Sequence, residues 1–264
     1  QVVLRNFKKS LNSSEGMILV TGPTGSGKTT TLYAGLRHIN DNSLNILTVE
    51  DPIEYTLEGI GQTQVNNKTG YDFARGLRSI LRQDPDVVML GEIRDEETAR
   101  IAIQSSLTGH LVMSTVHTNS AAGAITRLRD MGIESFLLAS SLKTIISQRL
   151  IRRLCNKCKS ESKVSQVAID LLGLKKGETV FSANGCNDCD GTGFKGRIAI
   201  AESIQVGTVL KDMIHDEASE QDIQNVAFKD IQTIDQIGSE LLTKGLTSPE
   251  ELIRINNQKE DASV

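Results

Sequence analysis

Short, continuous apolar runs alternate along the first half of the chain with longer segments whose apolar residues recur at helical spacing. Such runs are typical of strands buried on both faces of a parallel sheet, and the segments between them predict helices that cover the sheet. Strands are predicted at residues 17–20, 46–49, 86–90 and 111–116. This alternation predicts an α/β fold with a mainly parallel central sheet.

The remaining pattern predicts further helices and one more strand. Helices are expected at residues 7–14, 30–39, 71–83 and 96–107, from Ser120 onward, along an amphipathic stretch at 134–154, and through 209–256. A strand is expected at 198–204. Residues 56–70 are rich in Gly, Gln, Asn and Thr, which predicts a loop or a small hairpin.

The first predicted strand leads into a glycine-rich segment whose order, Gly-Pro-Thr-Gly-Ser-Gly-Lys-Thr, fits the phosphate-loop pattern G-x-x-x-x-G-K-[ST]. The strand before it and the helix after it disfavour a chance glycine-rich turn with a stray lysine. Lys28 is placed to reach the β and γ phosphates, and Thr29 to offer its hydroxyl to Mg²⁺. The candidate nucleotide-binding residues are Gly22, Pro23, Thr24, Gly25, Ser26, Gly27, Lys28 and Thr29.

Polar side chains also follow the later strands. Glu50 comes directly after the second apolar run and Glu92 shortly after the third, where open parallel sheets bind their ligands. A carboxylate there can hold Mg²⁺ or polarise an attacking water, although a helix cap or a solvated turn uses the same residue types. His117 follows the fourth run, and the sequence leaves open whether it senses a γ-phosphate or makes a structural hydrogen bond.

Three arginines, Arg75, Arg78 and Arg82, share one stripe of the predicted 71–83 helix, opposite its apolar face. A solvated helix face explains most stripes of this kind. In ring-forming ATPases, however, arginines from one place stabilise charge on a γ-phosphate that is held in another. Both interpretations stay open at this stage.

The four cysteines form two C-x-x-C pairs, Cys155/Cys158 and Cys186/Cys189. In a reducing compartment this spacing predicts a closed, structural zinc site with four thiolate ligands. Such a zinc supplies apparent binding energy on the order of 10–16 kcal/mol, which helps to fold a small lobe with little core of its own. Disulfides or a redox pair are the alternatives.

Composition narrows the class of protein. The chain has 264 residues and a net charge of −4, from 29 basic and 33 acidic residues, so it has no overall attraction to nucleic acid or an anionic membrane. Aromatic residues make up 3% of the chain and Trp is absent, which disfavours stacking on single-stranded nucleic acid. No apolar stretch approaches the roughly 20 residues of a membrane helix, so we expect a cytoplasmic protein.

Taken together, these motifs resemble the secretion ATPases. The family's Walker A, Asp box, Walker B and His box have counterparts, in the same order, at 22–29, 48–54, 87–95 and 107–119. The four-cysteine lobe resembles that of the type II secretion ATPases and the type IV pilus assembly ATPases. It distinguishes the chain from the pilus retraction ATPases, which lack such a lobe.

The resemblance implies a RecA-like P-loop motor that hydrolyses ATP with magnesium, carries structural zinc and works as a homohexamer. It also implies partners: an inner-membrane platform protein and adaptor proteins of a secretion or pilus system, with peripheral membrane association through them and no nucleic acid. In this interpretation Lys28 and Thr29 bind phosphate and magnesium, Glu92 serves at the Walker B position, and Glu50 orients or activates water.

Further roles follow from the same resemblance. Arg78 and Arg82 are expected to stabilise charge or to contact a neighbouring subunit, and Arg75 and Arg94 are weaker candidates. His117 is expected to act as the sensor of the His box, with His110 nearby.

The expected organisation has four regions. These are a RecA-like ATPase core at 1–154, a four-cysteine zinc lobe at 155–200, a helical region at 201–257 and a disordered tail at 258–264. Members of the family carry additional amino-terminal domains that cover the nucleotide, and a chain without them is expected to hydrolyse ATP weakly and to form no ring alone. The alternatives are a nucleotide-dependent structural or switch subunit and a RecA-like ATPase that acts on nucleic acid.

Overall fold

The computed structural model describes residues 2–41, 43–229 and 231–260, with side chains as far as Asn256. The chain divides into two compact units. The first comprises the residues up to Ser147 together with Glu202–Ile231, and the second comprises Gln148–Ala201 together with the residues from Gln232 onward. Each unit has its own apolar core.

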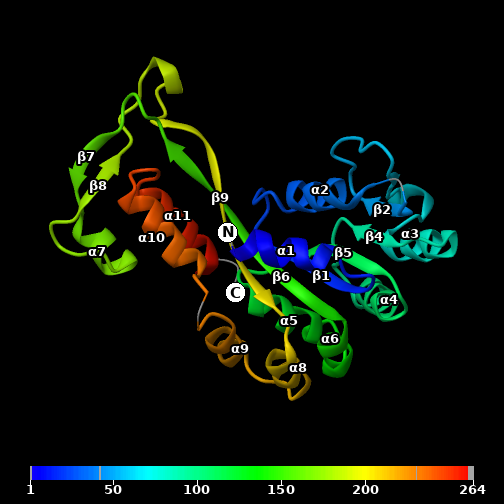
Figure 1. Ribbon diagram of the computed structural model, residues 1–264. Helices are drawn as coiled ribbons and strands as arrows, with labels where there is room; N and C mark the ends of the chain where they lie inside the picture. Colours follow the sequence, from blue (N-terminus) through cyan, green and yellow to red (C-terminus); the bar gives the residue numbers. More distant parts are fainter. Residues whose placement is uncertain (1, 42, 230, 261–264) are drawn as a thin grey trace. The chain divides into compact units, whose positions relative to one another are not determined.

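A central sheet organises the first unit (Figure 1). Its strands are β1 Gly16–Thr21, β2 Ile46–Glu50, β3 Gly61–Gln64, β4 Val87–Leu90 and β5 Leu111–Val116, with β6 Leu142–Leu154 and β9 Phe194–Gln205, which contain the unit boundary. The strand order is β3-β2-β4-β5-β1-β6-β9. Because β1 pairs in parallel with β5 and β6, β2 with β3 and β4, and β4 with β5, the predicted parallel sheet is confirmed.

Helices cover both faces of this sheet (Figure 1). One layer contains α1 Val2–Leu11 and α2 Lys28–Ile39. The other contains α3 Phe73–Ile80, α4 Glu96–Leu107, α5 Ala121–Asp130 and α6 Ser135–Ser141, against which α8 Thr208–His215 and α9 Glu220–Ala227 pack. Met17 and Leu19 of β1 belong to the core under the second layer, while Ile18 and Val20 alternate to the opposite face and are equally buried. Burial on both faces explains why the strand sequences are continuously apolar.

The register of the parallel strands brings their carboxyl ends to one edge. Thr21, the last residue of β1, pairs with Val116, the last residue of β5. Leu90 at the end of β4 pairs with Ser114, and Val49 near the end of β2 pairs with Leu90. The segments that follow these four strands therefore emerge side by side, where open α/β sheets bind ligands.

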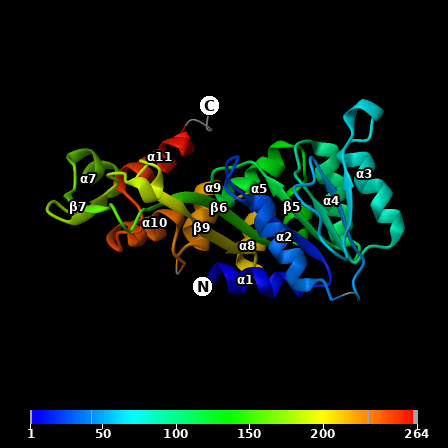
Figure 2. The same ribbon diagram turned by 90° about the horizontal axis from the view of Figure 1, so that it is seen from above.

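The second unit combines the antiparallel pair β7 Ser160–Lys163 and β8 Thr179–Ser182 with helices α7 Gln166–Leu172, α10 Ile234–Thr243 and α11 Pro249–Glu260 (Figure 2). Ile151, Val180 and Leu242 lie in its core. Glu251 of α11 is fully buried, and its carboxylate lies 2.8 Å from the guanidinium of Arg152 and 2.7 Å from that of Arg254. The pair with Arg152 attaches α11 to the part of β6 that belongs to this unit, and the pair with Arg254 lies within α11.

Most predicted elements are confirmed. The helix at 96–107 and the strand at 111–116 have the predicted bounds, and the other strands differ from the prediction by a few residues at their ends. The first helix occupies Val2–Leu11 rather than 7–14. None of the helices within the described ranges combines the length and apolar character that a bilayer crossing requires.

The predicted helix at 134–154 is wrong over most of its length. Only Ser135–Ser141 is helical, and Leu142–Leu154 forms β6. The apolar residues of this stretch fit both periods, and no glycine or proline marks the change. Its β-branched residues, Thr144 and Ile145 among them, pack well on a pleated sheet and are fully buried there.

Three other segments also differ in part from the prediction. Within 56–70, Gly61–Gln64 forms a parallel edge strand beside β2, and Asn66 makes an isolated antiparallel bridge with Tyr71 around the short 3-10 helix Asn67–Thr69. Most of the remaining segment is loop, as predicted. The expected tail at 258–264 begins as the end of α11, which continues to Glu260, and residues 261–264 lie outside the described residues. The expected 201–257 region is divided between the two units near Ile231.

We expect Ile145→Ala to lower the free energy of unfolding of the first unit by about 2–5 kcal/mol, because it removes a fully buried side chain from β6. Chemical denaturation followed by circular dichroism measures the change. Val209→Ala, at an exposed position of α8, is the matched control and is expected to change stability by no more than about 0.5 kcal/mol. Equal effects of the two substitutions would contradict the assignment of Ile145 to a buried strand.

Candidate functional site

The glycine-rich segment forms a tight turn between β1 and α2. The φ angles are 144° at Gly22, 77° at Gly25 and 86° at Gly27, all in the region that favours glycine. Helix α2 begins at Lys28, and no side chain caps its first turn. The amino end of a helix carries partial positive charge and unpaired N–H groups, so this turn is suited to bind phosphate.

Lys28 lies across this turn. Its side chain is largely buried, and its ammonium group donates hydrogen bonds to the carbonyl oxygens of Gly22 at 2.9 Å and Pro23 at 3.2 Å. Thr29 follows it in the first turn of α2 and is partly exposed. The ammonium group and the hydroxyl are therefore both at the turn, as the phosphate-loop pattern requires.

Backbone hydrogen bonds hold Glu92 just beyond the end of β4. The N–H of Gly91 donates to Val49 O at 2.8 Å, and the N–H of Ile93 donates to Thr115 O at 2.9 Å. The hydroxyl of Thr115 donates to Gly91 O at 2.7 Å. The position of the Glu92 backbone is thus fixed from both neighbouring strands, β2 and β5.

The Glu92 carboxylate links the ends of β4 and β5. Its Oε1 lies 2.5 Å from the guanidinium of Arg94, and its Oε2 lies 3.4 Å from Nε2 of His117. Within the described part of the chain, Oε2 is buried and accepts no hydrogen bond. These residues, with Arg127, line a cavity of about 310 Å³. The predicted Glu92 and His117 are therefore brought together, with one carboxylate oxygen that accepts no hydrogen bond from the described residues.

The pKa of His117 is lowered from its ordinary value. Partial burial is the largest cause, and the positive charges of Lys28 and Arg94 act in the same direction. The nearby Glu92 carboxylate raises the pKa but does not outweigh them. The ring is therefore neutral at neutral pH, and Lys28 is close enough to influence it.

Glu50 lies in a different environment from Glu92. Its side chain is buried, and both carboxylate oxygens accept hydrogen bonds. Oε1 accepts from the Thr48 hydroxyl at 2.5 Å and from Nε2 of Gln62 at 3.0 Å, and Oε2 accepts from the Tyr33 hydroxyl. Burial and the neighbouring carboxylate raise the pKa of Tyr33, which stays a hydrogen-bond donor.

Sequence reasoning missed Tyr33 and Gln62. Tyr33 lies on a helix whose apolar spacing already explains it as a core residue, and Gln62 lies in a polar segment without a motif. The hydroxyl of a buried tyrosine needs a hydrogen-bond partner, and this requirement could have indicated a polar contact at Tyr33.

The predicted arginines have separate positions. Arg78 on α3 pairs with Glu97 on α4 at 2.5 Å, and both side chains are substantially exposed. Arg82 is exposed in the short 3-10 helix Leu81–Gln83 that follows α3, and Arg75 donates to Gly70 O at 3.3 Å. Arg94, by contrast, belongs to the Glu92 site.

His110 is not near His117. It precedes β5 and lies 3.0 Å from the carbonyl of Ser105 near the end of α4, whereas His117 follows the same strand at its other end. A strand of this length separates the two by about 20 Å. The expectation that His110 lies near His117 is therefore wrong.

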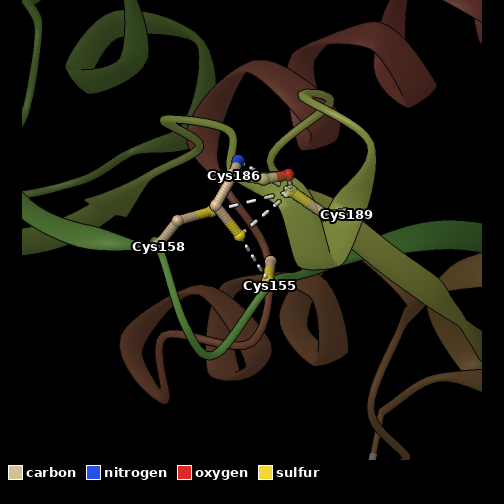
Figure 3. Close-up of side chains that lie close together, drawn as sticks. All are labelled: Cys155, Cys158, Cys186 and Cys189. Carbon is tan, nitrogen blue, oxygen red and sulfur yellow. Dashed lines mark hydrogen bonds between the residues drawn. The ribbon is translucent and has the colours of Figure 1, made fainter.

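The four cysteines converge in the second unit (Figure 3). Their sulfur atoms all lie within 4.8 Å of one another, and the separations include 3.9 Å for Cys155 to Cys186, 3.8 Å for Cys158 to Cys189 and 3.7 Å for Cys186 to Cys189. Four thiolates about 2.3 Å from a zinc ion lie about 3.8 Å apart in a tetrahedron. The observed spacing fits that geometry.

Hydrogen bonds to the cluster favour thiolate at one position. Although burial by itself raises the pKa of Cys189, the N–H groups of Cys186 and Gly193 each donate to its sulfur at 3.2 Å, and the net pKa is lowered to about 7. Lys157 and Lys195 pair with Asp188 beside the cluster, at 2.8 and 2.9 Å. This donor set suits a soft divalent metal ion.

The parallel sheet, the phosphate loop after β1 and the Glu92 and His117 side chains after β4 and β5 define a RecA-like P-loop protein of the α/β class. Comparison with known proteins narrows this class. A model of the family described as type II/IV secretion system protein matches residues 2–254, and the chain belongs to that family.

Curated relatives agree with this assignment. The chain is 52% identical over 255 residues to the type II secretion system ATPase E of Vibrio cholerae, which covers 96% of this chain and 51% of that protein. It is 53% identical over 253 residues to the type II secretion system protein E of Pseudomonas aeruginosa, covering 95% of this chain and 50% of that protein. The chain therefore spans about half the length of these relatives.

Solved structures share the fold. The pilus retraction motor PilT, determined with bound ADP, superposes with a TM-score of 0.71 at 31% identity, covering 94% of this chain and 63% of that one. The ATPase DotB of Legionella pneumophila superposes with a TM-score of 0.70 and covers 96% of this chain and 63% of its own, but at 22% identity it supports the fold alone.

We expect His117 to titrate below its ordinary pKa and Lys28→Ala to raise that pKa, because the substitution removes a nearby positive charge. Since the folded state depresses this pKa, the stability that His117 contributes is present above the ordinary pKa and is lost as the pH falls toward the folded value. NMR titration of the His117 ring between about pH 5 and 8 measures the pKa. Lys176→Ala, at an exposed position in the second unit, is the control, and a wild-type midpoint above the ordinary value would contradict the assignment.

Proposed function

We propose that this chain is the ATP-hydrolysing part of a motor that powers type II secretion or type IV pilus assembly. One observation carries the proposal: Glu92 lies 3.4 Å from His117 at the edge of the sheet where a phosphate loop opens, and the charge of Lys28 in that loop lowers the pKa of His117. The relative named type II secretion system ATPase E and the family membership support the same activity.

The residues present suit MgATP. The loop from Gly22 to Thr29 binds the phosphates through its N–H groups, and Lys28 exchanges its carbonyl partners for phosphate oxygens. The Thr29 hydroxyl and Oε2 of Glu92 are oxygen donors of the kind Mg²⁺ prefers, and the ion, when bound, neutralises charge on the phosphates.

His117 is proposed as the sensor of the γ-phosphate. Its ring is neutral and lies beside Glu92, so Nε2 can either donate to Glu92 or serve an incoming phosphate, depending on its tautomer. Glu50 is a weaker candidate for water activation, because both of its carboxylate oxygens already accept hydrogen bonds from protein groups. We assign it instead to positioning.

Arg78 and Arg82 are proposed to reach a neighbouring subunit. Their exposure on α3 and the following turn leaves both available for such a contact, and Arg78 would exchange Glu97 for the new partner. A homohexamer at the cytoplasmic face of the inner membrane, which acts on a platform protein and adaptors, is the assembly that this role requires.

Two other functions are less well supported. A nucleotide-dependent switch subunit would use the same loop but would not need the arrangement of Glu92 with His117 and Arg94. An ATPase that acts on nucleic acid would need a basic groove with aromatic residues, and the chain has 3% aromatic residues and a net charge of −4.

Lys28→Ala is expected to lower kcat/KM for MgATP by about 10²–10³-fold, because it removes a preorganised cation from the phosphate site. Phosphate release measures turnover, and a fluorescent ATP analogue measures binding. Lys176→Ala, which removes an exposed lysine of the second unit, should leave both unchanged. Wild-type turnover no higher than that of Lys28→Ala would reject the motor function.

We also propose zinc as the metal of the cysteine cluster, with a structural role. Protein purified without chelator should contain about one zinc per chain by elemental analysis. Cys186→Ser should lose the metal and make the second unit sensitive to protease, since the ion contributes folding energy. Asn156→Ser changes an exposed residue between two ligands and should retain the metal; wild-type protein without metal would reject the proposal.

A further inference from the structure

The side chains around Glu50 form a hydrogen-bonded group that we call the Tyr33 network, comprising the buried Tyr33, Thr48 and Glu50 and the partly buried Gln62. We infer that Tyr33 is a positioning residue: its hydroxyl fixes the acidic segment after β2, Asp51–Glu54, relative to the phosphate loop. This inference rests on the proposed ATP hydrolysis and adds to it a residue that no motif identifies.

The hydroxyl of Tyr33 has three hydrogen-bonding partners. It donates to Oε2 of Glu50, and it accepts from Nε2 of Gln62 at 3.2 Å and from the backbone N–H of Glu54 at 3.4 Å. Nε2 of Gln62 carries two hydrogens and also lies near Oε1 of Glu50 and the carbonyl of Tyr55, so its bond to the phenol is a shared one. The side chain is fully buried, which makes each of these bonds costly to lose.

The segment after β2 depends on side chains for its backbone hydrogen bonds. Gln62 accepts from the N–H of Leu57 at 2.7 Å and donates to the carbonyl of Tyr55 at 3.2 Å. Asn40, at the end of α2, donates to the carbonyl of Glu58 at 2.9 Å. The ring of Tyr55 packs edge-on against Tyr33, with centroids 4.8 Å apart at 84°.

Tyr33 also belongs to the helix that the phosphate loop opens. It lies five residues after Lys28 on α2, which corresponds to a rise of about 7.5 Å along a rigid helix. Lys28 and Tyr33 are thus about one and a half turns apart on the same helix. The contacts of the Tyr33 hydroxyl therefore fix the position of the segment after β2 relative to Lys28. The exposed side chains of Asp51 and Glu54 are carried by the segment that is fixed in this way.

The network also accounts for the environment of Glu50. Its carboxylate is held by three donors, from α2, β2 and β3, and lies 1% exposed. An attacking water would have to displace one of these donors to reach it. The buried carboxylate is therefore the acceptor that orients Tyr33 and Gln62, while the exposed acids of the same segment remain free to face substrate.

Tyr33→Phe tests this role, because it keeps the ring and its contact with Tyr55 but removes the hydroxyl. We expect kcat for MgATP to fall by about 10²-fold, because a small misplacement of groups near the reacting atoms has an effect of this size. KM should stay within about twofold of the wild-type value. Amide hydrogen exchange at Glu54 and Leu57 should accelerate by about tenfold without nucleotide. The midpoint of global unfolding should shift by no more than the loss of a single buried hydrogen bond causes.

Tyr55→Phe is the matched control. It removes a hydroxyl from the adjacent ring, on a side chain that is 48% exposed, and should change neither kcat nor exchange. Glu50→Gln keeps an acceptor for Tyr33 and should retain more activity than Lys28→Ala. In the double variant, the loss of activity should be smaller than the combined losses of Glu50→Gln and Tyr33→Phe, because both substitutions act through one network.

The outcomes separate this inference from the proposed function. Wild-type protein without turnover above Lys28→Ala would overturn the proposed function and this inference with it. Normal wild-type turnover with an unchanged kcat in Tyr33→Phe would overturn the positioning role alone, even if exchange accelerates. Loss of activity in Glu50→Gln to the level of Lys28→Ala would identify Glu50 as a reacting group and overturn the inference as well.

Discussion

The alignment of the carboxyl ends of four parallel strands is the constraint on which the rest of the site depends. Thr21 pairs with Val116, and Leu90 pairs with both Ser114 and Val49, so the residues that follow β1, β2, β4 and β5 emerge together. Hydrogen bonds from Gly91 and Ile93 to both neighbouring strands then fix Glu92. A slip of one residue in any of these pairings would turn the following side chains toward the opposite face of the sheet.

Burial gives two glutamates of this edge different chemistry. Glu50 is enclosed by neutral donors from three elements, whereas Glu92 keeps one oxygen without a donor and shares the other with Arg94. A carboxylate whose oxygens are all occupied orders its surroundings, while one with an available oxygen can serve a ligand. The resemblance to the secretion ATPases placed both residues at the site but could not distinguish these environments.

The parts of the fold set by local pattern could be predicted from the sequence. Helix α4 and strand β5 have unambiguous periods, and the phosphate loop has a spacing that its chemistry requires. Strand β6 could not be predicted, because its burial comes from pairing with β1, which is more than a hundred residues away. The Tyr33 network was missed for the same reason, since Gln62 meets Tyr33 only through the placement of the edge strand β3.

The bonds that Lys28 makes to its own loop bear on which anions the site selects. The carbonyl groups of Gly22 and Pro23 already satisfy part of the ammonium group, which has little contact with water. An anion must offer more than these two acceptors to displace them, and a single weakly charged oxyanion gains little by the exchange. A chain of phosphates that also reached the N–H groups of α2 would gain from both, so we expect the loop to discriminate by charge and length before any catalytic group takes part.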